Sequence, residues 1–119
     1  MLRVLIVDDA KLMRYSLIKI LKSIGHEIVG EAEDGNIAYE RYKELKPDLV
    51  TMDMSMPNLD GIGAVEKICE EFPEAKIIMV SSIEDRTLTY EAIAAGALDF
   101  INKPPQEDEV KEKISKIIK

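Results

Sequence analysis

Short apolar segments alternate along the chain with longer stretches in which apolar residues recur at helical spacing. The apolar segments lie at 4–7, 28–29, 49–52, 76–80 and 100–101. Such segments, rich in β-branched residues, are typical of strands that other elements cover on both faces. Between them, the helical spacing predicts helices that end at Gly25, Lys46, Pro73 and Gly96. A last helix has an apolar stripe made of Val110, Ile114, Ile117 and Ile118.

Five strand-then-helix units follow one another without a linker, which predicts one domain over residues 1–119. Parallel neighbouring strands need right-handed crossover connections, and these place helices on both faces of the sheet. We therefore expect a doubly wound α/β fold with three layers. In such sheets, ligands bind beyond the carboxyl ends of the strands, near the point where the strand order reverses. The segment 34–36, Asp-Gly-Asn, is expected to form a turn after the second strand.

Composition narrows the classes of function. Of the 119 residues, 46% are hydrophobic and 33% are charged, as expected for one folded domain. The formal net charge of −7 disfavours direct nucleic-acid binding, because phosphate backbones repel a negative surface. No apolar segment approaches the roughly 20 residues of a membrane-spanning helix, so no membrane insertion is expected. The single cysteine argues against a disulfide framework and favours a cytoplasmic location.

Polar residues gather at the predicted carboxyl ends of the strands. Asp8 and Asp9 follow the first strand, and Asp53 follows the third. Ser81 follows the fourth strand, and Lys103 follows the fifth. Crowded carboxylates repel one another unless a cation joins them, and magnesium prefers carboxylate oxygens together with waters and phosphate. Lysine and serine can both contact phosphoryl oxygens, so this set predicts a phosphoryl site with a carboxylate as its acceptor.

Four motifs in this order indicate a known family. They are LIVDDA at 5–10, DLVTMDMSMPNLDG at 48–61, VSS at 80–82 and DFINKP at 99–104. With these motifs, the chain resembles bacterial two-component response-regulator receiver domains over essentially its whole length, most closely the stand-alone chemotaxis CheY type. The resemblance implies a flavodoxin-like (βα)5 fold with the sheet order 2-1-3-4-5.

The same resemblance implies a magnesium site and a phosphoacceptor. Asp53 matches the phosphoacceptor, and Asp9 and Asp53 match the direct Mg²⁺ ligands. Asp8 matches a ligand that acts through a water molecule, and the backbone carbonyl of Ser55 matches the third protein ligand. Asp60, in contrast, is expected to cap the third helix rather than to bind metal.

Four further residues match other positions of the family's motifs. Lys103 resembles the lysine that pairs with the acceptor, and Ser81 matches the hydroxyl residue that moves toward the phosphoryl group. Phe100 matches the aromatic switch residue, although it could also be an ordinary core residue. Pro104 matches the proline whose peptide bond with the preceding lysine is usually cis.

The resemblance implies a phosphorylation-controlled signalling switch, plausibly in chemotaxis. A sensor histidine kinase would supply the phosphoryl group to Asp53. The face of the fourth helix, fifth strand and fifth helix would then bind a downstream target protein. The chain is expected to catalyse only its own phosphorylation and a slow dephosphorylation. Slow decay is predicted because Ile83, two residues beyond Ser81, cannot hydrogen-bond an attacking water.

Three alternatives remain open at this point. The chain could be a receiver domain cut from a larger response regulator, or a degenerate receiver that only binds proteins. It could also be an aspartyl-phosphate phosphatase similar to the haloacid dehalogenase group. That group carries its nucleophile on the first strand in an Asp-x-Asp pattern and usually has a cap insertion. Here Asp8 and Asp9 are adjacent, and no segment is long enough for a cap.

Overall fold

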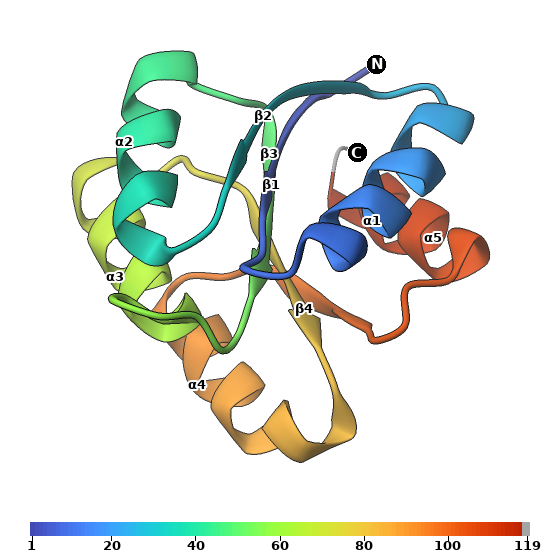
Figure 1. The fold of residues 1–119 in the computed structure, drawn as a ribbon. Coiled ribbons are helices and arrows are strands. Elements are labelled where there is room, and N and C mark those ends of the chain that lie inside the picture. The colour runs from blue at the N-terminus through green and yellow to red at the C-terminus, as the bar shows by residue number, and fades with distance from the viewer. Residues whose placement is uncertain (118–119) are drawn as a thin grey trace.

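Five parallel strands form one sheet in the order β2-β1-β3-β4-β5 (Figure 1). The structure is a computed structural model, and it describes residues 1–117. The strands are β1 (Arg3–Val7), β2 (Glu27–Ala32), β3 (Leu49–Asp53), β4 (Ile77–Ser81) and β5 (Asp99–Asn102). Each neighbouring pair is parallel. The strand order reverses at β1 and β3, which confirms the predicted doubly wound arrangement.

Helices cover both faces of the sheet (Figure 1). They are α1 (Lys11–Ser23), α2 (Gly35–Leu45), α3 (Gly61–Glu71), α4 (Arg86–Ala95) and α5 (Glu107–Ile117). A short 3₁₀ helix, η1 (Ile83–Asp85), precedes α4. Helices α1 and α5 pack on one face, whereas α2, α3 and α4 pack on the other. Ile118, which was predicted to continue the stripe of α5, lies outside the described residues.

The continuous apolar segment of β1 is explained by this two-sided covering. Leu5 and Val7 belong to the core under α2, α3 and α4, and Val4 and Ile6 belong to the core under α1 and α5. Successive side chains of a strand point to opposite faces. A strand covered on both sides therefore has no polar face, as its sequence predicted. Among residues 1–117, no helix combines the length and the apolar character that crossing a bilayer requires.

The connections differ from expectation at one place. The segment 34–36 does not form a separate turn, because Asp34 caps α2 by accepting a hydrogen bond from Ile37 N–H at 2.9 Å. Asp and Asn favour both turns and helix caps, so the local sequence does not separate these outcomes. Asp60 caps α3 as predicted, and its side chain accepts from Gly63 N–H. The peptide bond between Lys103 and Pro104 is cis, as the resemblance implied.

Candidate functional site

Three carboxylates meet at the carboxyl ends of the sheet. Asp8 and Asp9 directly follow β1, and Asp53 is the last residue of β3. Each offers an oxygen atom, and these atoms all lie within 4.8 Å of one another. Asp8 and Asp53 are only 4% and 2% exposed, whereas Asp9 is exposed. The structure therefore brings together the three acids that the sequence predicted to converge.

Lys103 joins this cluster from the end of β5. Its Nζ lies 2.5 Å from Asp53 Oδ1 and 3.9 Å from Asp8 Oδ2. The backbone N–H of Lys103 donates to the Ser81 carbonyl at 2.9 Å, which extends the pairing of β4 and β5 by one residue. This bond sets the position from which the side chain reaches Asp53. We call Asp8, Asp9, Asp53, Ser81 and Lys103 the carboxyl-end rim.

The carboxyl-end rim holds more negative charge than Lys103 neutralises. Burial raises the pKa of Asp8 from 3.8 to about 6, and the nearby charge of Asp53 adds to this increase. Burial also raises the pKa of Asp53, although its hydrogen bond with Lys103 opposes the change. Burial would lower the pKa of Lys103, but the contact with Asp53 outweighs it and raises that pKa. A divalent cation with oxygen ligands fits such a set of donors.

The loop between β3 and α3, which carries Ser55, is tied to the start of α2. Asn58 has a left-handed backbone with φ of 67°, and its Nδ2 donates to Asp34 Oδ2 at 2.7 Å. A second tie joins Gly35 N–H to the Leu59 carbonyl at 2.8 Å. Ser55 itself is exposed, two residues beyond the end of β3. The ties hold the loop beside the carboxylates, and the role of the Ser55 carbonyl stays a prediction.

Ser81 is fully buried at the end of β4. Its Oγ lies 3.0 Å from the Ser82 carbonyl and 2.5 Å from Thr89 Oγ1. Within residues 1–117, the described hydrogen bonds of this Oγ go to these two groups rather than to the side chains of Asp53 or Lys103. The structure therefore places Ser81 on the predicted rim, with its Oγ in contact with Thr89 of α4.

Phe100 is half-buried on β5 and lies close to two cations. The guanidinium of Arg86 is 4.4 Å from the ring centroid, and Lys113 Nζ is 4.8 Å from it. The ring of Tyr90 meets Phe100 edge-on, with a centroid separation of 6.4 Å. These contacts connect Phe100 with α4 and α5, so a change in its rotamer would alter the surface of both helices.

A family comparison decides what kind of domain this is. The profile of the response regulator receiver domain matches residues 4–115. The chain belongs to the response regulator receiver domain family.

Whole-length relatives of this receiver domain include chemotaxis proteins. The chain is 50% identical to the chemotaxis protein CheY of Thermotoga maritima over 117 residues, which cover 98% of each protein. It is 50% identical to CheY of Bacillus subtilis, covering 98% of this chain and 97% of that protein. It also resembles a part of a longer protein: the protein-glutamate methylesterase/protein-glutamine glutaminase of T. maritima is 48% identical, with 87% of this chain and 30% of that protein covered.

Solved receiver structures have the same fold. The response regulator domain of T. maritima CheB superposes with a TM-score of 0.86 at 42% identity, covering 96% of this chain and 93% of that one. A CheX–CheY–BeF3–Mg²⁺ complex from Borrelia burgdorferi gives a TM-score of 0.92 at 34% identity, covering 98% and 89%. Phosphorylation-controlled signalling in chemotaxis is consistent with these relatives, and the phosphatase alternative is not favoured. Receiver domains generally depend on Mg²⁺, which the three gathered carboxylates fit.

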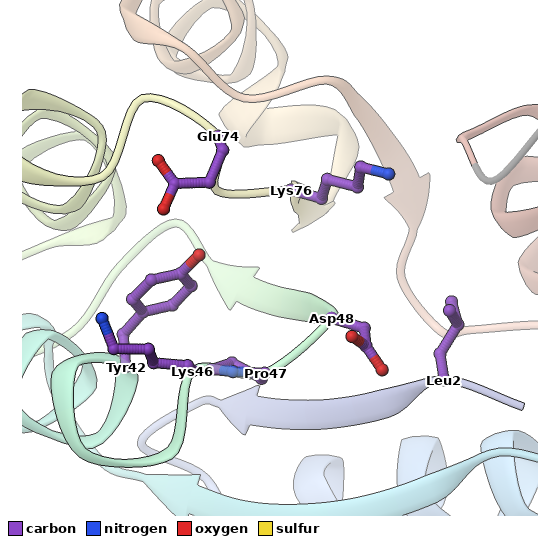
Figure 2. A pocket seen from close by; sticks show the side chains of 7 residues that line it. All are labelled: Leu2, Tyr42, Lys46, Pro47, Asp48, Glu74 and Lys76. Carbon is purple, nitrogen blue, oxygen red and sulfur yellow. The ribbon is translucent and has the colours of Figure 1, made fainter.

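A hollow of about 510 Å³ lies at the other end of the receiver domain (Figure 2). We call its lining the amino-end rim, because it is built from residues that precede β1, β3 and β4, apart from Tyr42 on α2. The lining residues are Leu2, Tyr42, Lys46, Pro47, Asp48, Glu74 and Lys76. The hollow is therefore separate from the carboxylate cluster of the receiver.

Sequence reasoning missed three polar residues that support the carboxyl-end rim and the loop beside it. Arg14 on α1 donates to the Asp8 carbonyl at 2.6 Å and to Glu31 at 2.8 Å. Asn58 and Thr89 make the contacts described above. For Arg14 a signal existed, since it stands at helical spacing with the buried Leu17 and Leu21. An arginine on the apolar face of a helix needs acceptors inside the protein.

Proposed function

We propose that this receiver domain is a switch that accepts a phosphoryl group on Asp53 and thereby changes the surface that a target protein binds. The supporting observation is the contact between Lys103 and Asp53 inside a cluster of carboxylates from two separate strand ends. A buried carboxylate that lacks full neutralisation is costly for folding. Such a cost is typical of a site that performs chemistry. The proposal assigns the whole of residues 1–119 to this one domain.

Asp53 Oδ2 is the proposed nucleophile. Lys103 Nζ and Met54 N–H both donate to Oδ1, at 2.5 and 2.9 Å. Among residues 1–117, the described hydrogen bonds of the Asp53 carboxylate go to this one oxygen. Oδ2 would attack the phosphorus of a phosphohistidine on a sensor histidine kinase. The new O–P bond forms as the P–N bond breaks, and the electron pair of that bond leaves with the imidazole nitrogen.

Asp8, Asp9, Asp53 and the Ser55 carbonyl are the residues that would hold Mg²⁺. When bound, the ion neutralises charge on the carboxylates and on the phosphoryl oxygens. Lys103 keeps its positive charge because the contact with Asp53 raises the pKa of its ammonium group. Lys103 could therefore pair with a phosphoryl group on Asp53. The chain would thus catalyse its own phosphorylation and its slow dephosphorylation.

The proposed output surface is the face of α4, β5 and α5. Phosphorylation would draw the Ser81 hydroxyl to a phosphoryl oxygen and shift Phe100 among its contacts with α4 and α5. Tyr90 is 59% exposed and rests edge-on against Phe100, so that shift would reach the protein surface. A switch of this kind works only through a different interaction of the phosphoryl group with its two states. The solved B. burgdorferi CheY is bound to CheX, and we propose a protein target for this chain as well.

Phosphorylation with a small donor tests this proposal. The protein is incubated with Mg²⁺ and acetyl phosphate, and its intact mass is measured over time. We expect one added phosphoryl group on the wild type and none on Asp53→Asn. Asp60→Asn is the matched control, because Asn caps a helix as well as Asp does and should leave labelling unchanged. A lasting label supports the switch, whereas rapid multiple turnover would support a phosphatase. Labelling of Asp53→Asn would refute the assignment.

A cytoplasmic location stays a prediction.

A further inference from the structure

Thr89 on α4 contacts Ser81 of the carboxyl-end rim, and Thr89 lies outside the four family motifs. Its side chain is fully buried, and its Oγ1 lies 2.5 Å from Ser81 Oγ. The same Oγ1 lies 3.0 Å from the carbonyl of Asp85, one turn earlier along the chain. A buried hydroxyl group needs a hydrogen-bond partner, so these contacts have energetic consequences.

The protons of the two hydroxyls can be assigned in two ways. Each hydroxyl carries one proton and two acceptor lone pairs. In the first arrangement, Ser81 donates to the Ser82 carbonyl and Thr89 donates to Ser81. In the second, Ser81 donates to Thr89 and Thr89 donates to the Asp85 carbonyl. In both arrangements the proton of Ser81 is directed to a protein acceptor, so Ser81 must break a contact before it can donate to a phosphoryl oxygen.

The release of Ser81 would leave Thr89 satisfied. When Ser81 turns away, the Thr89 proton can remain on the Asp85 carbonyl, which accepts it in the position that the structure already shows. The buried threonine therefore has a partner in both states. A hydroxyl pair with two satisfied arrangements can change between them without stranding a polar group.

We propose that Thr89 is a positioning residue that holds the Ser81 hydroxyl in its resting orientation and thereby weakens capture of the phosphoryl group. This inference rests on the proposed function, in which Ser81 contacts a phosphoryl oxygen. Removal of the Thr89 hydroxyl costs the contact with Asp85 in both states, but it costs the contact with Ser81 in the resting state only. We expect phosphoryl-group affinity to rise about fivefold, the equivalent of one net hydrogen bond.

Beryllofluoride, a mimic of the phosphoryl group, is the probe for this inference. With Mg²⁺ present, its dissociation constant is measured by ¹⁹F NMR for wild type, Thr89→Val and Thr89→Ser. Valine keeps the shape of threonine and removes the hydroxyl, whereas serine keeps the hydroxyl. We expect tighter binding by Thr89→Val and wild-type binding by Thr89→Ser. A change in thermal stability alone would not produce this pattern.

The same titration in a Ser81→Ala background identifies the route of the effect. There, Thr89→Val should leave the dissociation constant unchanged, because the hydroxyl that Thr89 positions is gone. Unchanged or weaker binding by Thr89→Val in the otherwise wild-type protein would overturn the inference, and so would an equal gain in the Ser81→Ala background. If Thr89→Val fails to fold, Thr89→Ala carries the same prediction. Failure of the wild type to bind beryllofluoride or accept phosphate would instead overturn the proposed function.

Discussion

At the carboxyl-end rim, Asp8 and Asp53 are almost fully buried and share the charge of Lys103. At the amino-end rim, Asp48 is exposed and its Oδ2 accepts from the backbone N–H of Arg3 at 2.8 Å. The Arg3 guanidinium in turn donates to the Leu45 and Lys46 carbonyls at the end of α2.

Charge therefore has opposite effects at the two ends of one sheet. Arg3 satisfies carbonyls that the end of a helix leaves without partners, which stabilises the fold. The carboxylates of Asp8 and Asp53 are buried without full neutralisation, and their raised pKa values report the cost. We infer that the amino-end rim stabilises the fold and that the carboxyl-end rim gives up stability for function.

The largest difference between the two rims should appear in the phosphorylation rate when one lysine of each rim is replaced by methionine. Lys103→Met removes the charge beside Asp53, and we expect phosphorylation by acetyl phosphate to slow about 100-fold, the usual loss for one group that stabilises developing charge. Lys76→Met removes a charge from the amino-end rim and should leave the rate unchanged. The rates are read from intact mass against time. Equal rates for the two variants would remove Lys103 from the mechanism.

The sequence predicted the composition of the carboxyl-end rim because a parallel sheet places all its strand ends on one edge. The apolar pattern reveals the strands, and four of the rim residues stand just after such segments: Asp8, Asp9, Asp53 and Lys103. Their convergence therefore followed from the topology of the sheet. The contact of Thr89 with Ser81 did not follow, since it depends on how far α4 rotates over the end of β4. The contact of Asn58 with Asp34 links residues 24 positions apart through a left-handed backbone. Periodicity carries no information on either contact.

Residues with a left-handed backbone that are not glycine offer the next comparison, since one lies in the loop beside the carboxyl-end rim and one lies in the amino-end rim. These are Asn58, with φ of 67°, and Lys46, with φ of 45°. Glycine suits both backbones, so each Gly variant removes only a side chain. We expect Asn58→Gly to weaken Mg²⁺ binding about tenfold, because it frees the loop that carries Ser55. Lys46→Gly should bind Mg²⁺ as the wild type does. Calorimetric titration measures both affinities, and equal losses would contradict a specific role for Asn58.

The pH dependence of the free energy of unfolding should reveal the cost of burying the Asp8 carboxylate. Its pKa is about 6 in the folded protein, against an ordinary value of 3.8. Between these values the unfolded chain has lost a proton that the folded chain keeps, so a rise in pH favours unfolding. In the presence of a chelator, we expect the free energy of unfolding to fall by about 1 to 2 kcal/mol from pH 4 to pH 6, relative to Asp8→Asn.

Urea unfolding of both proteins at each pH measures this difference. Above about pH 7, where Asp8 has lost its proton in both states, the difference should be constant, with Asp8→Asn the more stable protein. Mg²⁺ at neutral pH should recover the lost stability of the wild type. If the free energy of unfolding changed with pH in the same way for both proteins, burial of the Asp8 carboxylate would carry no such cost.

The smallest effect concerns two exposed apolar residues near opposite ends of the sheet. Ile83 is 82% exposed beyond the end of β4, and Leu98 is 49% exposed just before β5. Ile83→Asn gives an attacking water a hydrogen-bond partner, so we expect the phosphorylated protein to decay about threefold faster. Leu98→Asn should decay at the wild-type rate. Loss of the phosphoryl mass after removal of the donor measures both, and unchanged decay in Ile83→Asn would contradict the predicted cause of slow dephosphorylation.

The position of the phosphoryl group tests the central claim most directly. The protein is labelled with acetyl phosphate with and without Mg²⁺, digested, and the modified residue is located by fragment masses. We expect the label to lie on Asp53 and not to form when Mg²⁺ is left out. A label on His26 or on another acid, or one that forms equally well without a divalent cation, would contradict it.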